Sequence, residues 1–396
     1  MTFELMVAEY TQAGVPDVFI LPVDAPFGIA VCSERKDALP KKEQRLLRVG
    51  VLGCGPIAQA AHFESCTKAR NAKLYAICDV ADDLRDRMAA THAPTRSFDN
   101  YDKMLADPDL EAVIIATSDA FHVPAALLAL QAGKHVLCEK PLATSVDEAE
   151  SLRAAVKSSG LTLQVGHMKR YDAGLQAAKS FVDGPMGQLV ALKAWYCDNT
   201  HRYAMTDAVQ PLIVTSKNAR KPSENPKADL EQYYMLAHGS HLVDTARYFA
   251  GEIEAVDARL INRAGIRCWF VDVQFASGVL GHLDLTVAVR MDWHEGFQIY
   301  GEQGSILGKT YNPWYYKSSD VDIFDEADGS THRVLGADGH FYRRQVEGFA
   351  ETILNRTKQT GADIEDGIAS VRAIVAIAHS VRMGQPVRLA DVAGGL

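Results

Sequence analysis

Hydrophobic and polar residues follow two different patterns along the 396-residue chain. In its first patterned part, short apolar runs alternate with helix-like stretches. This pattern predicts strands at 47–52, 73–78, 95–98, 112–116, 134–138 and 161–165, and helices at 56–69, 82–92, 101–106, 120–132 and 146–159. Alternation of buried strands and helices is typical of a doubly wound parallel sheet with helices on both faces. The prediction is an α/β Rossmann domain at residues 47–166.

The remainder alternates apolar and polar residues over longer runs. These runs predict strands at 188–196, 253–262, 266–275, 279–289, 297–300, 321–324 and 331–335, with helices at 173–182, 240–249, 342–355 and 366–383. Period-two alternation indicates an antiparallel sheet with one covered face. Residues 167–396 are therefore predicted to form an α+β domain for substrate binding and oligomerisation, with a large, mostly antiparallel sheet. Its two closing helices can pack back on the Rossmann domain.

Two segments fall outside these patterns. Residues 1–46 form an N-terminal extension, which either packs on the surface or reaches a partner subunit or the active site. Residues 209–229 are rich in Lys, Pro, Asn and Ser and predict a long irregular insertion. Loops of this length are often lids or disordered.

The first strand leads into a glycine-rich turn. The sequence LRVGVLGCGPIA places Gly53, Gly55 and Ala58 in a G-x-G-x-x-A pattern between a strand and a helix start. Gly53 permits the turn and Gly55 lets a pyrophosphate approach the backbone. Together with Pro56 and Ile57, this loop is the predicted phosphate-binding element, because helix N-termini favour anions.

The second strand ends in Asp79, at the separation expected for the acid that binds an adenosine ribose. A carboxylate there accepts hydrogen bonds from ribose hydroxyls and repels a 2′-phosphate. The residues that follow are Val80, Ala81, Asp82 and Asp83, with no Arg, which favours NAD over NADP. The alternative is that Asp79 only caps the next helix.

The fourth and fifth strands carry the next candidates. Thr117 and His122 lie in A-T-S-D-x-x-H and are expected along the cofactor, with a capping or packing role as the alternative for His122. The fifth strand leads into Glu139-Lys140-Pro141, beyond the carboxyl end of the sheet, where ligands bind. Glu139 and Lys140 are therefore expected to contact the cofactor. Lys140 is also expected to contact the substrate and to stabilise developing negative charge.

Composition narrows the class of protein. The net charge of −9 argues against nucleic acid or membrane partners. No apolar run is long enough to span a bilayer, and the N-terminus lacks the pattern of a secretory signal. The seven cysteines are odd in number and without a C-x-x-C pair, which favours reduced thiols in the cytoplasm and no metal site.

Together with G-S-H-L-V-D-T-A-R-Y-F-A-G at 239–251, these motifs resemble the Gfo/Idh/MocA oxidoreductases over residues 47–389. The resemblance implies a Rossmann domain followed by a domain with a large sheet. It also implies NAD(P)-dependent oxidation or reduction of sugars, inositols or related polyols. Assembly as homodimers or homotetramers through the sheet is implied as well.

The resemblance also places the predicted catalytic residues. His241 matches the family's catalytic His and can accept a hydroxyl proton. The family has an Asp four residues before this His, but Ala237 stands there. Either His241 and Lys140 suffice, or His238 or Tyr234 compensates. Asp244, one turn later, is expected to orient groups rather than to react.

Other substrate-binding candidates rest on weaker signals. Lys169 and Tyr171 belong to the segment that leads out of the Rossmann domain. Asp198 and Asn199 follow a strand, and Trp293 lies near another. Each has an ordinary structural alternative.

The function expected from these residues is an NAD-dependent dehydrogenase for a secondary hydroxyl of a sugar, inositol or related polyol. One alternative is an NAD-dependent glycoside-cleaving enzyme that works by transient oxidation and elimination. The other is a non-enzymatic NAD-binding sensor, against which Lys140 and His241 argue.

Overall fold

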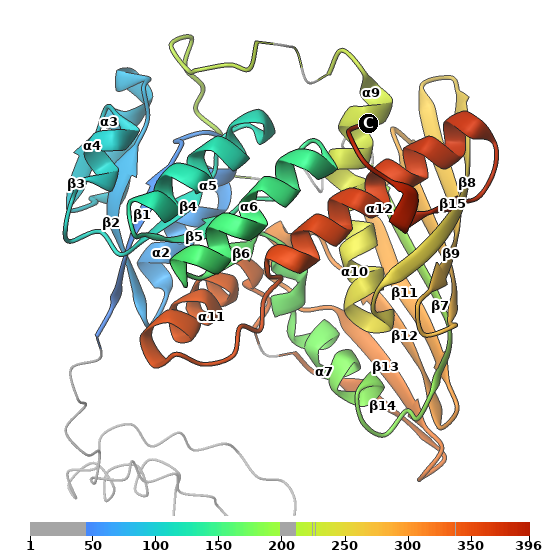
Figure 1. Ribbon diagram of the computed structural model, residues 1–396. Coiled ribbons are helices and arrows are strands. Elements are labelled where there is room, and N and C mark those ends of the chain that lie inside the picture. Colours follow the sequence, from blue (N-terminus) through green and yellow to red (C-terminus); the bar gives the residue numbers. More distant parts are fainter. Residues whose placement is uncertain (1–44, 199–210, 224, 226, 337) are drawn as a thin grey trace, which may run out of the picture. The chain divides into compact units, whose positions relative to one another are not determined.

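The computed structural model describes residues 45–198, 211–223, 225, 227–336 and 338–396. In this part of the chain the strands form two sheets, one of six strands and one of nine (Figure 1). Nearly all of the N-terminal extension lies outside the described residues, as does the candidate Asn199. None of the described helices is long and apolar enough to cross a membrane.

The six-stranded sheet is parallel throughout, with the order β3-β2-β1-β4-β5-β6. Its strands are β1 (Leu47–Leu52), β2 (Ala72–Cys78), β3 (Arg96–Phe98), β4 (Ala112–Ile115), β5 (His135–Cys138) and β6 (Leu163–Val165). Every residue of β4 is buried, as expected for a central strand covered on both faces. This strand order is that of a doubly wound dinucleotide-binding sheet, which confirms the predicted fold class.

The helices of this part follow the predicted ranges closely. They are α2 (Phe63–Lys68), α3 (Asp82–His92), α4 (Tyr101–Leu105), α5 (His122–Gln131) and α6 (Val146–Ser159). α6 begins where the Ser145 hydroxyl accepts the Glu148 N–H, and it ends at Gly160, which has φ +63°. Two irregular turns precede helices: a π-helical turn, η1 (Ala58–His62), before α2, and a 3₁₀ turn, η2 (Asp119–Phe121), before α5.

The nine-stranded sheet has the order β14-β13-β12-β11-β7-β10-β9-β8-β15. Its strands are β7 (Leu189–Asp198), β8 (Ile253–Arg263), β9 (Ile266–Phe275), β10 (Leu280–Val287), β11 (His294–Gly301), β12 (Gly304–Thr310), β13 (Asp320–Asp325), β14 (Ser330–Val334) and β15 (Val387–Arg388). Only the β7–β10 pair is parallel. The predicted large, mostly antiparallel sheet is therefore confirmed.

One strand, β12, has no counterpart among the predicted elements. Its sequence, GSILGKT, contains two glycines and a short apolar run, which is a weak strand signal. A side chain at Gly308 would overlap the ring of Phe297 on β11, and one at Gly304 would overlap the Phe324 carbonyl. The glycines thus serve close approach between neighbouring elements, which only the tertiary structure reveals.

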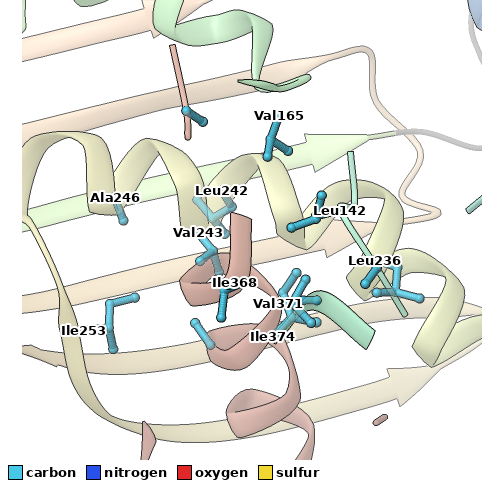
Figure 2. Packing of buried hydrophobic residues seen from close by; sticks show 14 of the residues in the cluster. Leu142, Val165, Leu236, Leu242, Val243, Ala246, Ile253, Ile368, Val371 and Ile374 are labelled. Carbon is cyan, nitrogen blue, oxygen red and sulfur yellow. The ribbon is translucent and has the colours of Figure 1, made fainter. Parts of the chain in front are cut away.

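The second part also contains α7 (Ala173–Val182), α9 (Leu230–Tyr234), α10 (Ser240–Ala250), α11 (Phe341–Asn355) and α12 (Ile364–Met383). α12 contacts α6, α10 and β8, and α11 contacts α2. Figure 2 shows Ile368, Val371 and Ile374 of α12 among Leu142, Val165 and side chains of α10. A Cβ at Gly367 would lie 2.7 Å from Leu142, so the glycine lets α12 approach this closely.

A buried ionic network crosses the same region. The Arg170 guanidinium donates to both carboxylate oxygens of Asp244 on α10, the shortest bond being 2.7 Å, and to Asp366 on α12 at 2.7 Å. Arg247 also donates to the Asp366 carboxylate at 3.2 Å. Burial alone would raise the pKa of Asp244, but Arg170 and His167 hold it below its ordinary value. The network therefore fixes α10 against α12 through paired buried charges.

We expect Asp244→Ala to lower the free energy of unfolding by about 3–5 kcal/mol, because Arg170 is left as a buried, partly unpaired cation. Urea denaturation monitored by circular dichroism measures this change. Glu254→Ala, which removes an exposed partner of Arg388, is the control and should change stability little. Equal effects of the two substitutions would contradict a structural role for the buried network.

Candidate active site

The glycine turn after β1 forms an open cradle. Gly53 has φ +93°, and a Cβ there would lie 2.9 Å from the Ala116 carbonyl oxygen. At Gly55 a Cβ would meet no atom within 4 Å, so the backbone faces open space. Pro56 and Ile57 start the helix that follows. This geometry fits a phosphate group that approaches backbone N–H groups at a helix start.

The Asp79 carboxylate lies beside this cradle. Its two oxygens accept the Cys54 N–H at 2.7 Å and the Ala81 N–H at 2.9 Å. Asp79 therefore holds the glycine turn in place, a role that the sequence analysis did not foresee. Asp79 is not the N-cap residue of α3, because Ala81 occupies that position. Each carboxylate oxygen keeps a second acceptor position for a ribose hydroxyl.

The loop after β4 contains one buried hydroxyl that has no partner among the described residues, Thr117 Oγ1. An unpaired buried hydroxyl is costly, so it suits a site that a polar ligand completes. His122 lies 2.7 Å from the Pro141 carbonyl through Nδ1 and 3.1 Å from the Thr117 carbonyl through Nε2. Both ring nitrogens face backbone carbonyls, and a neutral imidazole can donate to one of them. His122 therefore braces two loops instead of offering a nitrogen to a cofactor.

Glu139 holds the backbone of Lys140 in place. Its carboxylate lies 2.9 Å from His62 Nε2 and accepts the Lys140 backbone N–H at 3.1 Å. Burial would raise the pKa of Glu139, but His62 and Lys140 lower it, so the carboxylate stays ionised. Its oxygens face protein groups, which makes Glu139 a support for the loop. The cofactor contact that the sequence suggested for Glu139 gains no support from this geometry.

Lys140 connects the two parts of the chain. Its Nζ donates to the carbonyl oxygen of Ala237 at 2.9 Å. Ala237 belongs to a second π-helical turn, η4 (Met235–Gly239), which joins α9 to α10. The position where the family pattern calls for an Asp therefore supplies a backbone acceptor to Lys140 instead of a carboxylate.

His241 lies in the first turn of α10, buried, and parallel to the ring of Tyr196 on β7, with ring centroids 6.0 Å apart. The Tyr196 hydroxyl lies 3.1 Å from His238 Nδ1. The other ring nitrogen of His238, Nε2, is 3.8 Å from the Asp198 carboxylate. Two histidines, a phenol and a carboxylate thus gather at the start of α10.

A buried lysine lies on the same cluster. Lys169 forms an ion pair with Glu295 on β11, and both side chains are buried. Its Nζ is 4.5 Å from the centroid of the Tyr196 ring and 5.8 Å from that of Trp293. Burial lowers the pKa of Lys169 and raises that of Glu295. Lys169 and Trp293 are therefore brought to the site, as the sequence suggested.

The electrostatics favour a neutral His241. Its pKa is held well below the ordinary value of 6.5, first by burial and then by Lys140, Lys169, His167 and His238. Burial also lowers the pKa of Lys140, against the opposing effect of Glu139 and Asp119. A neutral imidazole next to cationic groups can accept a proton while the cations stabilise an oxyanion.

A further candidate, Tyr171, also requires correction. Tyr171 does not reach this cluster, because its hydroxyl donates to Gln164 Oε1 at 3.0 Å and its ring packs against Gly348 and Gly361. It is a buried structural residue and not a substrate ligand. The described residues also contain no group of three or more His, Cys, Asp or Glu placed to hold a metal ion.

Sequence reasoning missed Tyr196, Glu295, His167 and His62. Tyr196 and Glu295 lie at buried positions of β7 and β11 close to the helix start, and the alternation alone does not mark them as functional. Glu295 could have been recognised as a charged residue on the covered face of a strand. Such a residue needs a buried partner, and Lys169 supplies it.

Two sequence profiles of one family match the chain. The oxidoreductase family with an NAD-binding Rossmann fold matches residues 47–167, and the GFO/IDH/MocA C-terminal domain matches residues 175–307. The chain belongs to the Gfo/Idh/MocA family. It is accordingly an oxidoreductase that acts on CH–OH groups and has an NAD-binding Rossmann domain.

Similar proteins agree with this assignment. The inositol 2-dehydrogenase of Rubrobacter xylanophilus is 29% identical over 358 residues, which are 86% of this chain and 92% of the relative. The scyllo-inositol dehydrogenase structure of Lactobacillus casei has a TM-score of 0.68 at 23% identity, covering 88% of this chain and 99% of its own. A levoglucosan dehydrogenase in complex with NADH has a TM-score of 0.70 at 20% identity, covering 87% and 99%. At these identities the two structures support the fold.

We expect Asp79→Ala to reduce the preference for NAD over NADP by about tenfold, because the variant no longer repels a 2′-phosphate. Equilibrium titration with both cofactors measures the ratio of dissociation constants. Asp82→Ala removes a neighbouring exposed carboxylate and is the matched control. An unchanged ratio in Asp79→Ala would assign the carboxylate to the support of the glycine turn alone.

Proposed function

We propose that this Gfo/Idh/MocA protein is an NAD-dependent dehydrogenase that oxidises a secondary hydroxyl of a sugar, an inositol or a related polyol. Residues 47–166 bind the dinucleotide and residues 167–396 carry most of the substrate site. The observation that supports the proposal best is the contact between Lys140, which follows β5, and Ala237 in the turn that leads into α10, the helix that bears His241.

The cofactor residues have separate tasks. Gly53, Gly55, Pro56 and Ile57 present backbone to the pyrophosphate, Asp79 accepts the ribose hydroxyls, and Thr117 donates its free hydroxyl. When bound, the nicotinamide supplies the hydride acceptor. The protein orients the substrate and handles its proton.

His241 is proposed as the general base. Its neutral imidazole accepts the hydroxyl proton, and the Lys140 ammonium donates to the substrate oxygen as negative charge develops there. His238 is proposed to assist through its contacts with the Tyr196 hydroxyl and Asp198. His238 and Asp198 lie near Ala237, the position where the family Asp is absent.

The substrate residues suit a polyhydroxylated ring. Asp198 and His238 offer hydrogen-bonding groups, as Asn199 would from outside the described residues. Lys169 contributes charge beside the aromatic faces of Tyr196 and Trp293. Apolar ring faces with a few fixed polar groups are typical of small-ligand sites.

We further propose a homodimer or homotetramer that is cytoplasmic. One face of the nine-stranded sheet presents exposed apolar side chains, namely Ile261, Phe270, Leu280, Tyr300, Leu307 and Phe324. An exposed apolar sheet face of this kind suits a symmetric interface. The described cysteines are free thiols, as expected in a reducing compartment.

The first test mixes the protein with NAD and a panel of free sugars, inositols, sugar acids and glycosides. We expect NADH absorbance to rise with one free polyol or sugar. Lys140→Ala should then reduce turnover by about 10²–10⁴-fold while still binding NAD. Lys157→Ala, an exposed lysine of α6, is the matched control and should leave turnover unchanged.

The outcomes separate the candidate functions. Release of an aglycone without net NADH would favour the glycoside-cleaving mechanism, for which the absent Asp is the supporting observation. No reaction with any compound would favour the sensor. Near-normal turnover of Lys140→Ala would refute the catalytic assignment of this lysine.

The pH dependence follows from His241. Because its pKa is depressed in the folded protein, the imidazole remains neutral below pH 6.5 and loses its base function only as the pH falls through the lowered value. We expect the acid limb of kcat/KM to lie below pH 6.5, and His241→Asn to abolish most turnover. An acid limb above pH 6.5 would contradict the assignment.

A further inference from the structure

Residues 211–221, here called the strap, lie between β7 and α9 yet contact the first sheet's loops. The Val214 N–H donates to Gln59 Oε1 at 2.9 Å, and Gln59 Nε2 donates back to the Val214 carbonyl at 2.8 Å. The same Gln59 nitrogen donates to the Cys54 carbonyl at 2.8 Å. The strap is therefore tied to the glycine turn by one side chain.

Two further contacts tie the strap to the neighbouring loops. The Ser216 hydroxyl donates to the Asp83 carboxylate at 2.7 Å. The Arg220 guanidinium lies 4.7 Å from the centroid of the Phe121 ring. Val214 and Ala219 pack, half-buried, against the core of the six-stranded sheet. The segment is thus held at several points although it has no helix or strand.

The three anchors share one feature of the topology. Gln59 follows the loop of β1, Asp83 that of β2, and Phe121 that of β4, and these three strands are neighbours in the sheet. Their loops are the ones that meet a dinucleotide bound at the carboxyl edge. Figure 1 shows the strap, in yellow-green, running from this edge towards α9.

The charge of the strap is equally specific. Residues 211–221 contain Lys217, Arg220 and Lys221 and no acidic residue. The loops they approach carry Asp79, Asp82, Asp83 and Asp119. A cationic segment over these loops is attracted to them and also to the pyrophosphate of a dinucleotide.

We propose that the strap is part of the cofactor site and retains the bound dinucleotide, so that release requires the contacts of Val214, Ser216 and Arg220 to open. The inference rests on NAD binding, which the family establishes, and not on the identity of the substrate. It predicts slow release of the bound cofactor.

The test uses the full chain and NADH as the probe. Ser216→Ala and Arg220→Gln are combined, because both lie on the strap and leave the residues of the first sheet unchanged. We expect the dissociation rate constant of NADH, measured by stopped-flow fluorescence after displacement with excess NAD, to rise by about tenfold or more. Leu212→Ser, at a 97% exposed position of the same strap, is the matched control and should not change the rate.

A second measurement separates retention from simple structural support. Amide hydrogen exchange of residues 213–220 should slow when NADH is added to the unsubstituted protein. A dissociation rate unchanged in the double variant, with exchange of the strap indifferent to NADH, would overturn the proposal. Neither readout depends on turnover, so a failure of the proposed dehydrogenase activity would be recognised separately.

Discussion

The buried Arg170 guanidinium is the constraint on which the active site depends. The cost of burying this cation is offset by two carboxylates, Asp244 on α10 and Asp366 on α12. Asp244 lies one turn after His241 on the same helix. The position of the proposed base is therefore set by a charge network that extends to the closing helix, although Asp366 is far away in the sequence.

The region around His241 and the nucleotide-binding loops around Asp79 carry charge of opposite sign. Lys140 and Lys169 lie close enough to His241 to depress its pKa, so the chemical centre is electropositive and suits a developing alkoxide. The nucleotide loops are acidic by contrast, with Asp79 beside the glycine turn. Such loops favour hydroxyl groups over phosphate near the ribose, while backbone N–H groups and the strap supply the positive potential for the pyrophosphate.

Elements with a strong local signal were predictable. The helices α3 and α6 match their predicted bounds, because the hydrophobic periodicity of each helix stops where a helix-ending residue stands, such as Gly160 after α6. The glycine turn, Asp79 and Lys140 were predictable because strand and loop order places them at one edge of a parallel sheet. Tyr171 and β12 were not, because their environments depend on distant residues: Gln164 binds the Tyr171 hydroxyl, and Phe297 fills the space at Gly308.

Ala237 stands four residues before His241, where the family has an Asp, and the local helix geometry limits what that spacing predicts. Counting four residues back from His241 assumes an α-helix, but η4 bonds five residues apart, so side chains before α10 are displaced around the axis. Lys140 uses one of its three N–H donors on the Ala237 carbonyl. The carbonyl acceptor does not titrate, unlike the carboxylate expected from the family, so within this contact only the amine of Lys140 changes protonation with pH. The loss of activity at low pH then depends on protonation of the histidines. Among them, His241 has a pKa that is clearly lowered by both burial and neighbouring cations.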